Sequence, residues 1–423
     1  MRCGFRRLAP LGLLLPGLLV PLPAGAQEPL TLDAALREAD SANALLPVAR
    51  YGVAAAGARV RAAEGLLWPS LSVGGDIHDG TPSAYAAGDA RLQLIADQVI
   101  YDGGALRAGV RTLRAQARSA HARYRVAQKD LELAVRSRFS ELLMIQDELA
   151  TRREGIARLQ TYLTGIQARQ AAGQGVAGDV LRTRVRLGTE QANVTDAERR
   201  LADARVELND LLGRDPAAPL ALAPLPPPTP PQTDSTGPWA DVPDVHQAVA
   251  DHDAAVAAEG IARAGRRPAL TLSANAGAEP LLGGTSGGAV LNTGSGLGLE
   301  VTLSLSWPVW DRGVYRARLA EARINAQQAG QVETAVRRQA RLSRQRALED
   351  LRHAYEEVTT RAATVPAARD SYLQAQSLYR GGGATALEVL DAYSSWIDAS
   401  NAYAGAMLTY RLAEAQVQRW STP

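Results

Sequence analysis

The chain has 423 residues, with 46 Lys and Arg against 44 Asp and Glu, so its formal net charge is only +2. This balance excludes the strong basic field that draws proteins to nucleic acid, and we expect no nucleic-acid partner. A single cysteine, Cys3, and five scattered histidines exclude a disulfide framework and a cysteine-based zinc site, so we expect no metal site and no cofactor.

The N-terminal segment has the features of a secretory signal peptide. Three arginines precede an apolar stretch from Leu8 to Leu22, and the small residues Ala24-Gly25-Ala26 follow it. We therefore expect residues 1–26 to be removed on export. Prolines interrupt the apolar stretch, which disfavours a transmembrane anchor, and Cys3 stands ahead of the stretch, which disfavours lipidation.

Two halves of similar pattern make up the remainder of the chain. The first half covers residues 27–215 and the second half covers residues 241–423. A proline-rich connector at 216–240 separates them, because proline cannot continue a helix. Each half opens with an Ala-rich helical pattern, at about 31–66 and about 241–265.

Equal spacing between equivalent motifs indicates that the halves are a structural duplication. Asp102 and Asp179 are 77 residues apart in the first half, and Asp311 and Glu388 are 77 residues apart in the second. The offset between the halves is 209 residues at both points. A constant offset over this length predicts two copies of one structural unit.

Short runs of alternating residues follow the opening helix of each half. They predict β-hairpins at about 69–101 and 268–309, because apolar and polar side chains alternate as on a strand with one apolar face. Leu299, Val301 and Leu303, for example, alternate with polar residues. Strands of about 9–11 residues can cross a bilayer. A half-buried sheet in a soluble protein shows the same alternation.

Long helical segments complete each half and predict coiled-coil hairpins at about 104–213 and 313–420. Glycine-rich turns at Gly173-Gln174-Gly175 and Gly381-Gly382-Gly383 separate the outgoing and returning helices. In the returning helices, apolar residues recur every seven positions, which keeps one stripe facing a partner helix. These residues are Val180, Leu187, Val194, Leu201 and Leu208 in the first half and Val389, Trp396, Tyr403, Tyr410 and Val417 in the second.

Four aromatic residues are expected at one rim of the strands, because the two ends of a hairpin lie side by side. They are Trp68, Tyr101, Trp307 and Trp310. Aromatic rims of this kind are typical of a membrane interface. About eight strands are needed to close a barrel, and an open edge is not tolerated in lipid. Strands that span a membrane would therefore require a dimer or a trimer of this chain.

The order and spacing of these elements resemble the TolC-like outer-membrane efflux protein family. The resemblance rests on the duplicated plan, on the turns Tyr101-Asp102-Gly103-Gly104 and Trp310-Asp311-Arg312-Gly313, and on the glycine-rich tips followed by Asp179-Val180-Leu181 and Glu388-Val389-Leu390-Asp391. It covers about residues 28–420. It implies a mainly α fold with a small transmembrane β part, in which three chains form a twelve-stranded barrel and an α-helical periplasmic tunnel.

The resemblance also implies a function and partners. The expected protein is a homotrimeric channel in the outer membrane of a Gram-negative bacterium, surrounded by outer-membrane lipid and extending into the periplasm. It would export drugs, other toxic compounds, metal ions or secreted polypeptides with a periplasmic adaptor (membrane fusion) protein and an inner-membrane pump. The adaptor would meet the tips of the hairpins, at Gly173, Gln174, Gly175, Gly381, Gly382 and Gly383.

The resemblance assigns the gate of the channel to Tyr379, Glu388 and Asp391. Glu388 and Asp391 lie one turn apart on one helix face, so threefold symmetry would converge their carboxylates into a filter for cations. The equivalents in the first half are Asp179 and Arg182, so the two hairpins differ in charge. Acidic residues near a helix N-terminus also favour the helix dipole, and this is the alternative explanation for the two carboxylates.

Two further expectations concern the lock of the gate and the class of protein. The positive partner found in some family members corresponds to a position near Ala384, which is neutral, so the lock is weaker or uses Arg380 or Arg182. No catalytic constellation is recognisable, and we expect no enzymatic activity. The alternative hypothesis is a structural periplasmic coiled-coil or adaptor protein whose strands form no transmembrane barrel.

Overall fold

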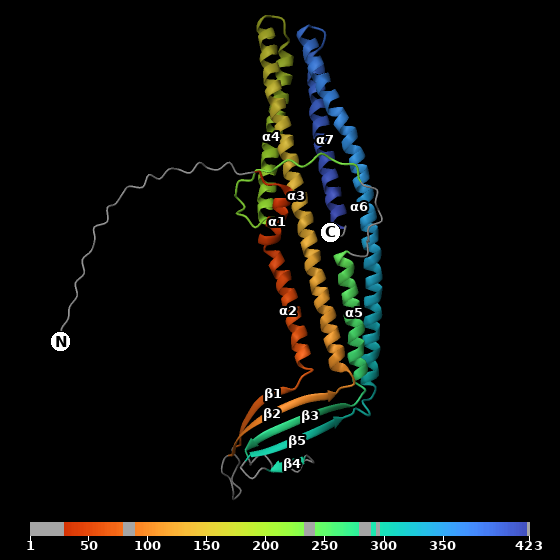
Figure 1. Cartoon of the computed structure of the whole chain (residues 1–423). Helices are drawn as coiled ribbons and strands as arrows, with labels where there is room; N and C mark the ends of the chain where they lie inside the picture. The colour runs from red at the N-terminus through yellow and green to blue at the C-terminus, as the bar shows by residue number, and fades with distance from the viewer. Residues whose placement is uncertain (1–28, 79–88, 232–241, 279–288, 293–296, 421–423) are drawn as a thin grey trace, which may run out of the picture.

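The computed structural model describes residues 29–78, 89–231, 242–278, 289–292 and 297–420. Long helices run away from a single β-sheet, which lies at one end of the molecule (Figure 1). The predicted signal peptide at 1–26 lies outside the described residues. In the described ranges, no helix carries a stretch that is long and apolar enough to cross a membrane.

The first half opens with two helices, so the single helix predicted at about 31–66 is wrong. The Asn43 side chain separates them, because its Nδ2 donates to Leu211 O at 3.1 Å and its Oδ1 accepts from Leu45 N at 2.9 Å. Such bonds compete with those of a continuous helix. The elements are α1 Leu32–Ala42, α2 Leu45–Gly65, β1 Ser70–His78, β2 Asp89–Tyr101, α3 Ala105–Ala171 and α4 Ala177–Leu211.

The second half repeats this order after a single opening helix. Its elements are α5 Pro243–Ala264, β3 Ala269–Ala278, β4 Ala289–Asn292, β5 Leu297–Ser306, α6 Val314–Arg380 and α7 Ala386–Arg419. The short strand β4 is an addition to the four predicted strands. Helices α3 and α6 contain 67 residues each, so each is about 100 Å long. The predicted fold class, mainly α with a small β part, is confirmed for the single chain.

The strands form one antiparallel sheet in the order β1-β2-β3-β5-β4. Leu94 lies opposite Val73 and Ala276, and Leu272 lies opposite Leu303, so the alternating apolar residues share one face. Several side chains of this face are 62–69% exposed, namely Leu71, Val73, Leu92, Leu303 and Leu305. The sheet is therefore a single layer with an uncovered apolar face and a polar face.

Equivalent turns join the sheet to the long helices in the two halves. The Asp102 carboxylate accepts hydrogen bonds from Gly104 N at 2.8 Å and from Leu106 N, which satisfies free N–H groups at the start of α3. Asp311 does the same for α6. The hydrogen bond from Tyr315 N–H is the main reason why the pKa of Asp311 is lowered.

The third residue of each turn, directly after the aspartate, has a left-handed backbone. Gly103 has φ of 69° and Arg312 has φ of 55°. A Cβ at Gly103 would lie 2.6 Å from Arg267 Cβ, so glycine is needed there for space as well as for conformation. Arg312 adopts the same conformation with a side chain, which costs about 1 kcal/mol.

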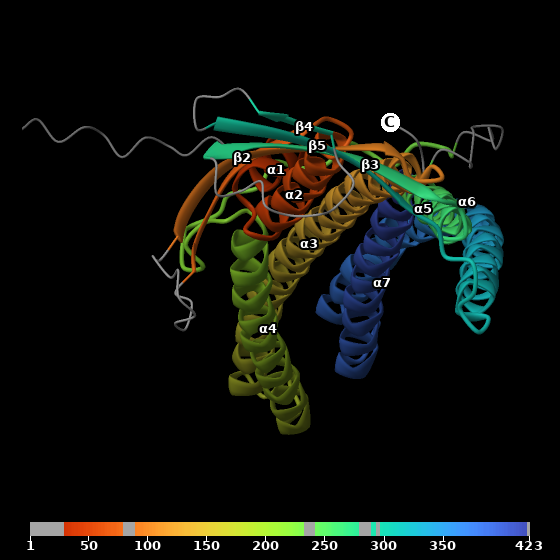
Figure 2. The same ribbon diagram turned by 90° about the horizontal axis from the view of Figure 1, so that it is seen from below.

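The helices lie side by side along an arc, as Figure 2 shows. Near the sheet the packing order is α2, α3, α5 and α6, and toward the free ends it is α4, α3, α7 and α6. One edge of this layer is therefore α6, and the other edge is α2 and α4. Exposed apolar side chains occur on both edges, including Leu45, Val48 and Tyr51 on α2 and Ile324 and Val332 on α6.

Contacts about midway along the molecule tie the connector and the C-terminal helix to the rest. Tyr410 Oη accepts a hydrogen bond from Thr229 N and donates one to Thr229 O, both at 3.1 Å. Arg419, only 7% exposed, pairs with Asp130 of α3 at 2.7 Å and with Asp244 of α5 at 2.9 Å. These bonds join α7 to the first half and to the connector.

Candidate functional site

The two glycine-rich turns at the free ends of the hairpins have the same backbone geometry. Gly173 follows α3 with φ of 73°, and Gly382 follows α6 with φ of 79°. Gln174 N donates to Arg169 O at 2.8 Å, and the equivalent bond from Gly383 N is also 2.8 Å. This is a Schellman ending, in which a left-handed residue favours glycine. The turn geometry thus accounts for both glycines.

The glycines of the turns differ in the space around them. A Cβ at Gly175 would lie 2.8 Å from Gln170 N, so a side chain does not fit there. Nothing lies within 4 Å of a Cβ built at Gly173 or Gly382. The backbone at both tips is therefore open to a partner that approaches along the axis of the hairpins.

The carboxylate of Glu388 caps α7. Its Oε2 accepts hydrogen bonds from Thr385 N at 2.6 Å and from Thr385 Oγ1 at 3.1 Å, while Glu388 N donates to Thr385 Oγ1 at 3.3 Å. These reciprocal bonds form a capping box. The geometry therefore supports the helix-terminus explanation for Glu388, although its side chain remains exposed at the tip.

Asp391 has a different environment from Glu388. It is exposed, and its side chain makes no hydrogen bond or ion pair within the described part of the chain. In the first half, Asp179 forms an ion pair of 3.7 Å with Arg182, which is itself largely exposed. The structure brings Asp179 and Arg182 together, but it does not bring Arg182 to either carboxylate of α7.

Arg380 also does not contact the acidic residues of α7. Its Nη2 donates to Gln376 Oε1 at 3.0 Å, one turn earlier in α6. Within the described ranges, neither arginine suggested for the lock pairs with Glu388 or Asp391.

An unpredicted contact at Tyr379 joins the two hairpins. Arg169 Nη1 donates to the carbonyl oxygen of Tyr379 at 2.7 Å, and the guanidinium lies 5.2 Å from the centre of the Tyr379 ring. Tyr162 packs edge-on against the same ring at 5.3 Å. Tyr379 therefore faces the first hairpin of its own chain. No sequence pattern links Arg169 and Tyr162 to Tyr379, because they lie on α3, more than 200 residues away.

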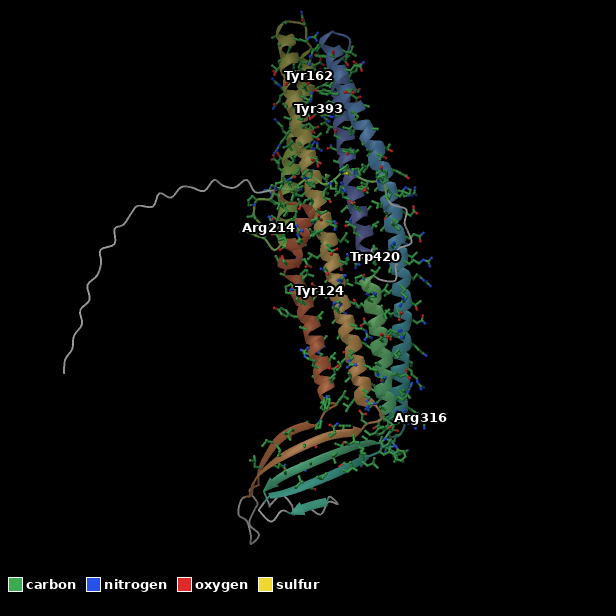
Figure 3. The ribbon with its side chains drawn as sticks, viewed as in Figure 1. Tyr124, Tyr162, Arg214, Arg316, Tyr393 and Trp420 are labelled. Carbon is green, nitrogen blue, oxygen red and sulfur yellow. The ribbon has the colours of Figure 1, made fainter. Side chains whose placement is uncertain are left out.

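Aromatic side chains fill the space between the hairpins near their free ends, where Figure 3 marks Tyr162 and Tyr393. Tyr372 stacks on Trp396 at 5.7 Å, and Tyr393 meets these two rings edge-on at 5.6 and 6.0 Å. Burial is the main reason why the pKa values of Tyr162, Tyr372 and Tyr393 are raised. We call Tyr162, Tyr372, Tyr379, Tyr393 and Trp396 the aromatic cluster.

Charged residues of the first hairpin support the aromatic cluster. Arg186 lies 5.4 Å from the centre of the Tyr393 ring and 3.1 Å from the carboxylate of Glu190, which is 1% exposed. Arg152 donates to the same carboxylate at 3.0 Å. Gly155 allows the close approach of α7, because a Cβ there would lie 2.5 Å from Tyr393 Oη. Gly155 and Glu190 are positions that sequence reasoning missed.

The four predicted rim aromatics lie at or beside strand ends that adjoin the helices. Figure 1 shows that the helices leave the sheet at this end. Trp68 lies between α2 and β1, Tyr101 is the last residue of β2, and Trp307 and Trp310 lie between β5 and α6. All four are exposed, from 46% for Tyr101 to 77% for Trp310. The structure therefore brings them to one level of the molecule.

The groups at the tips can interact with a ligand or a protein through their charges and through direct contact with the backbone. Among the described residues, no group of three or more His, Cys, Asp or Glu side chains is arranged to hold a metal ion. The tips offer open backbone at the glycine turns and exposed carboxylates at the start of α7. Such groups can attract cations or bind a protein.

Comparison with protein families finds one family model that matches both halves. The model, described as outer membrane efflux protein, matches residues 35–214 and 240–420. The outer membrane efflux protein BepC of Brucella suis biovar 1 (strain 1330) is 28% identical over 219 residues. This match covers 49% of the chain and 46% of BepC, so the chain spans about half the length of the curated relative it matches.

Solved structures of outer-membrane proteins have the same fold. The outer-membrane channel OprN superposes with a TM-score of 0.78 at 22% identity, covering 92% of this chain and 89% of OprN. The outer membrane protein VceC from Vibrio cholerae superposes with a TM-score of 0.80 at 17% identity, covering 92% of this chain and 95% of VceC. At these identities the likeness concerns the fold.

Proposed function

Because this chain belongs to the outer membrane efflux protein family, we propose that it forms, as a homotrimer, the outer-membrane duct of an efflux or secretion system. The family and its structural neighbours are channel proteins and not enzymes. In this proposal, three chains share one twelve-stranded barrel in the outer membrane of a Gram-negative bacterium. Their helices continue as a tube into the periplasm.

The observation that carries the proposal is the uncovered apolar face of the sheet. A face with side chains such as Val73, Leu303 and Leu305 between 62% and 69% exposed is unfavourable in water, at about 25 cal/mol per Å² of apolar surface. Lipid removes this cost. The opposite face carries polar residues such as Thr271 and Ser304, which suit the wall of a water-filled path.

The open edges of the chain support closure by further copies. Strand β1 has a neighbour on one side only, and β4 pairs only with Gly298–Val301 of β5. The remainder of β5 is therefore free to pair with β1 of the next chain. The helix layer has matching open edges, α6 on one side and α2 with α4 on the other. Strand β5 and helix α6 lie on one side of the chain, and β1 lies with α2 and α4 on the other. The sheet and the helix layer would therefore both join the next copy on the same side.

The tips at the other end supply the contacts to partners. In the proposal, a periplasmic adaptor meets the open backbone at Gly173 and Gly382, and an inner-membrane pump supplies the energy for transport. Tyr379, Glu388 and Asp391, with Asp179 and Arg182, surround the narrowest point. The rim aromatics lie at the lipid interface. The cargo consists of drugs, other toxic compounds, metal ions or secreted polypeptides.

Membrane fractionation with two matched variants tests the proposal. Leu303→Arg puts a charge on the apolar face and should cost about 2–4 kcal/mol near the middle of a bilayer. Ser304→Arg puts the same charge on the polar face and should cost little. We expect the wild type and Ser304→Arg to fractionate with outer membranes and to purify in detergent as trimers, and Leu303→Arg to be depleted from the membrane.

Two results would contradict the proposal. A wild-type protein that stays monomeric and dissolves in buffer without detergent would contradict the proposed duct and would support a periplasmic structural protein. Equal membrane yields of Leu303→Arg and Ser304→Arg would contradict the assignment of the lipid face.

A further inference from the structure

The regions where the helices meet the sheet contain an excess of arginine. We call residues 61–68, 101–111, 259–268 and 307–318 the junction. The junction contains nine arginines and four acidic residues, whereas the whole chain has 46 Lys and Arg against 44 Asp and Glu. The four rim aromatics also belong to the junction. Positive charge is therefore concentrated at the level of the rim aromatics.

The acidic residues of the junction already have partners. Asp102 and Asp311 accept backbone hydrogen bonds at the starts of α3 and α6. Glu64 and Glu259 pair with arginines at 2.6 and 2.7 Å. Several exposed arginines of the junction, in contrast, form no ion pair with another residue in the ranges that the structure describes. Four of these are Arg107, Arg111, Arg312 and Arg316, which we call the junction arginines.

Arg312 has a backbone conformation that favours glycine. Its φ is 55°, and the equivalent residue of the first half is Gly103. Non-glycine residues in such a conformation are typical of functional positions, because the strain has to be offset elsewhere. The Arg312 guanidinium lies 5.5 Å from the centre of the Trp310 ring, which is 77% exposed. The strained residue thus places a positive charge beside a rim aromatic.

Arg107 and Arg316 lie on the convex side of the helix layer. A hollow of about 740 Å³ is bordered by α2, α3, α5 and α6, and four neighbouring helices can border one hollow only on the concave side of their arc (Figure 2). Gln116 of α3 and Asn325 of α6 line this hollow. They stand nine residues after Arg107 and Arg316, which is about two and a half helical turns, so the arginines lie on the opposite side. Arg111 follows Arg107 by one turn and shares its side.

The junction arginines lie at the depth of a lipid headgroup layer. Figure 3 marks Arg316 where α6 meets the sheet. Arg107 and Arg316 are the third residues of α3 and α6, and Arg111 is the seventh residue of α3. At about 1.5 Å per residue, all three lie within about 10 Å of the helix starts. The headgroup region extends about 5–8 Å beyond the hydrocarbon on each side of a bilayer. Long arginine side chains can reach phosphate groups at this depth.

We propose that the junction arginines bind the phosphate groups of anionic phospholipids in the inner leaflet of the outer membrane. This inference rests on the proposed function, in which the rim aromatics lie at the lipid interface and the helices continue into the periplasm. A guanidinium donates paired hydrogen bonds to a phosphate and keeps its charge at physiological pH. Arginines near an anionic membrane surface also gain electrostatic attraction. The trimer therefore selects anionic over zwitterionic lipids around its periplasmic rim.

Fluorescence quenching by brominated lipids tests the inference, because the rim tryptophans report which lipids lie beside them. Purified trimers are reconstituted in vesicles of phosphatidylcholine and phosphatidylglycerol, with bromine on the acyl chains of one lipid or the other. We expect wild-type protein to prefer phosphatidylglycerol about fivefold, and to lose most of this preference in about 1 M salt. Arg107→Gln with Arg316→Gln should reduce the preference to about twofold or less.

Two further variants separate lipid binding from folding and from net charge. Arg312→Gly removes a charge and relieves the left-handed backbone, so it should lower the preference without lowering the melting temperature. Arg59→Gln is the matched control. Arg59 is exposed and lies six residues before the end of α2, at a depth similar to that of Arg111, but it lines the hollow on the concave side. This variant should keep the wild-type preference.

Other results would overturn the inference. Equal quenching by the two lipids in inserted wild-type trimers would contradict the headgroup site, and the proposed duct would stand. An equal loss of preference in Arg59→Gln and in the double variant would contradict the outward placement of Arg107 and Arg316. A wild-type protein that stays monomeric, or that neither lipid quenches, would contradict the proposed function and this inference with it.

Discussion

The roles of the two carboxylates at the start of α7 can be distinguished by experiment, because only one of them caps the helix. Glu388 closes a capping box with Thr385, whereas the Asp391 side chain has no partner within the described part of the chain. Glu388→Ala removes the charge and the cap, and Glu388→Gln removes the charge but keeps a side chain that can complete the box. Asp391→Asn removes a charge alone.

The expected magnitudes follow from these contacts. Loss of an N-cap bond costs about 1 kcal/mol, so the first turn of α7 should open about fivefold more often in Glu388→Ala. Unit charges about 7 Å apart in water interact by about 0.6 kcal/mol. Neutralising one carboxylate in each chain of a trimer should therefore weaken cation block by about 1.8 kcal/mol, or about twentyfold.

Two assays read these effects separately. Hydrogen exchange of the first turn of α7 should accelerate in Glu388→Ala and stay near wild type in Glu388→Gln and Asp391→Asn. Cation block of the conductance in planar bilayers should weaken in all three variants, and the double variant Glu388→Ala with Asp391→Ala should also conduct more. Asp350→Asn, an exposed position on α6, is the control and should change neither readout.

Two results would contradict these roles of Glu388 and Asp391. Equal exchange rates in Glu388→Ala and Glu388→Gln would show that the cap does not stabilise the turn. Unchanged conductance and unchanged cation block in the double variant would remove both carboxylates from the gate.

Three further outcomes are expected. Arg312→Gly relieves a left-handed φ of 55° and should raise the melting temperature by about 1–2 °C, whereas Gly103→Ala should lower it. In denaturant titrations, Glu190→Ala removes the carboxylate partner of Arg186 and leaves Arg152 with Glu148 alone, so it should lower the free energy of unfolding by about 3 kcal/mol. The exposed Glu198→Ala should lower it by less than about 1 kcal/mol. Burial raises the pKa of Tyr393 above the value of about 10 that tyrosine has in the unfolded chain. The contribution of Tyr393 to stability is therefore complete below about pH 10 and is lost as the pH rises toward the higher folded pKa. Tyr393→Phe should reduce this loss of stability in thermal melts at alkaline pH. Unchanged stability in any of these variants would contradict the corresponding contact.

Local chemistry in the sequence was sufficient for most of the elements, but not for the break between α1 and α2 or for β4. The period of seven from Val180 to Leu208 predicts a helix with one buried stripe, and the structure has α4 from Ala177 to Leu211. The glycines at Gly173 and Gly382 mark helix ends, because left-handed residues are needed there. The break at Asn43 was missed because one of the bonds that hold its side chain is long-range: its partner Leu211 O lies 168 residues away.

The candidate site also has features that the sequence predicts and a contact that it does not predict. The positions of the tips, of Glu388 and of Asp391 follow from turn signals and repeat spacing. The use of the Glu388 carboxylate as a cap is a local motif, since Thr385 stands three residues before it. The contact of Arg169 with Tyr379 joins residues 210 apart, and no periodic pattern in either helix indicates it.

The sequence by itself indicated the repeat spacing, the long helices and the two-faced strands, because these depend on spacing and on side-chain type within a few residues; it missed the break at Asn43 and the strand β4. Only the tertiary structure decided which helices are neighbours, that α4 and α6 are the open edges, and that aromatic rings join the two hairpins of one chain. The physical reason is that a seven-residue stripe requires some partner but does not specify which one. Shape and charge complementarity between distant segments make that choice.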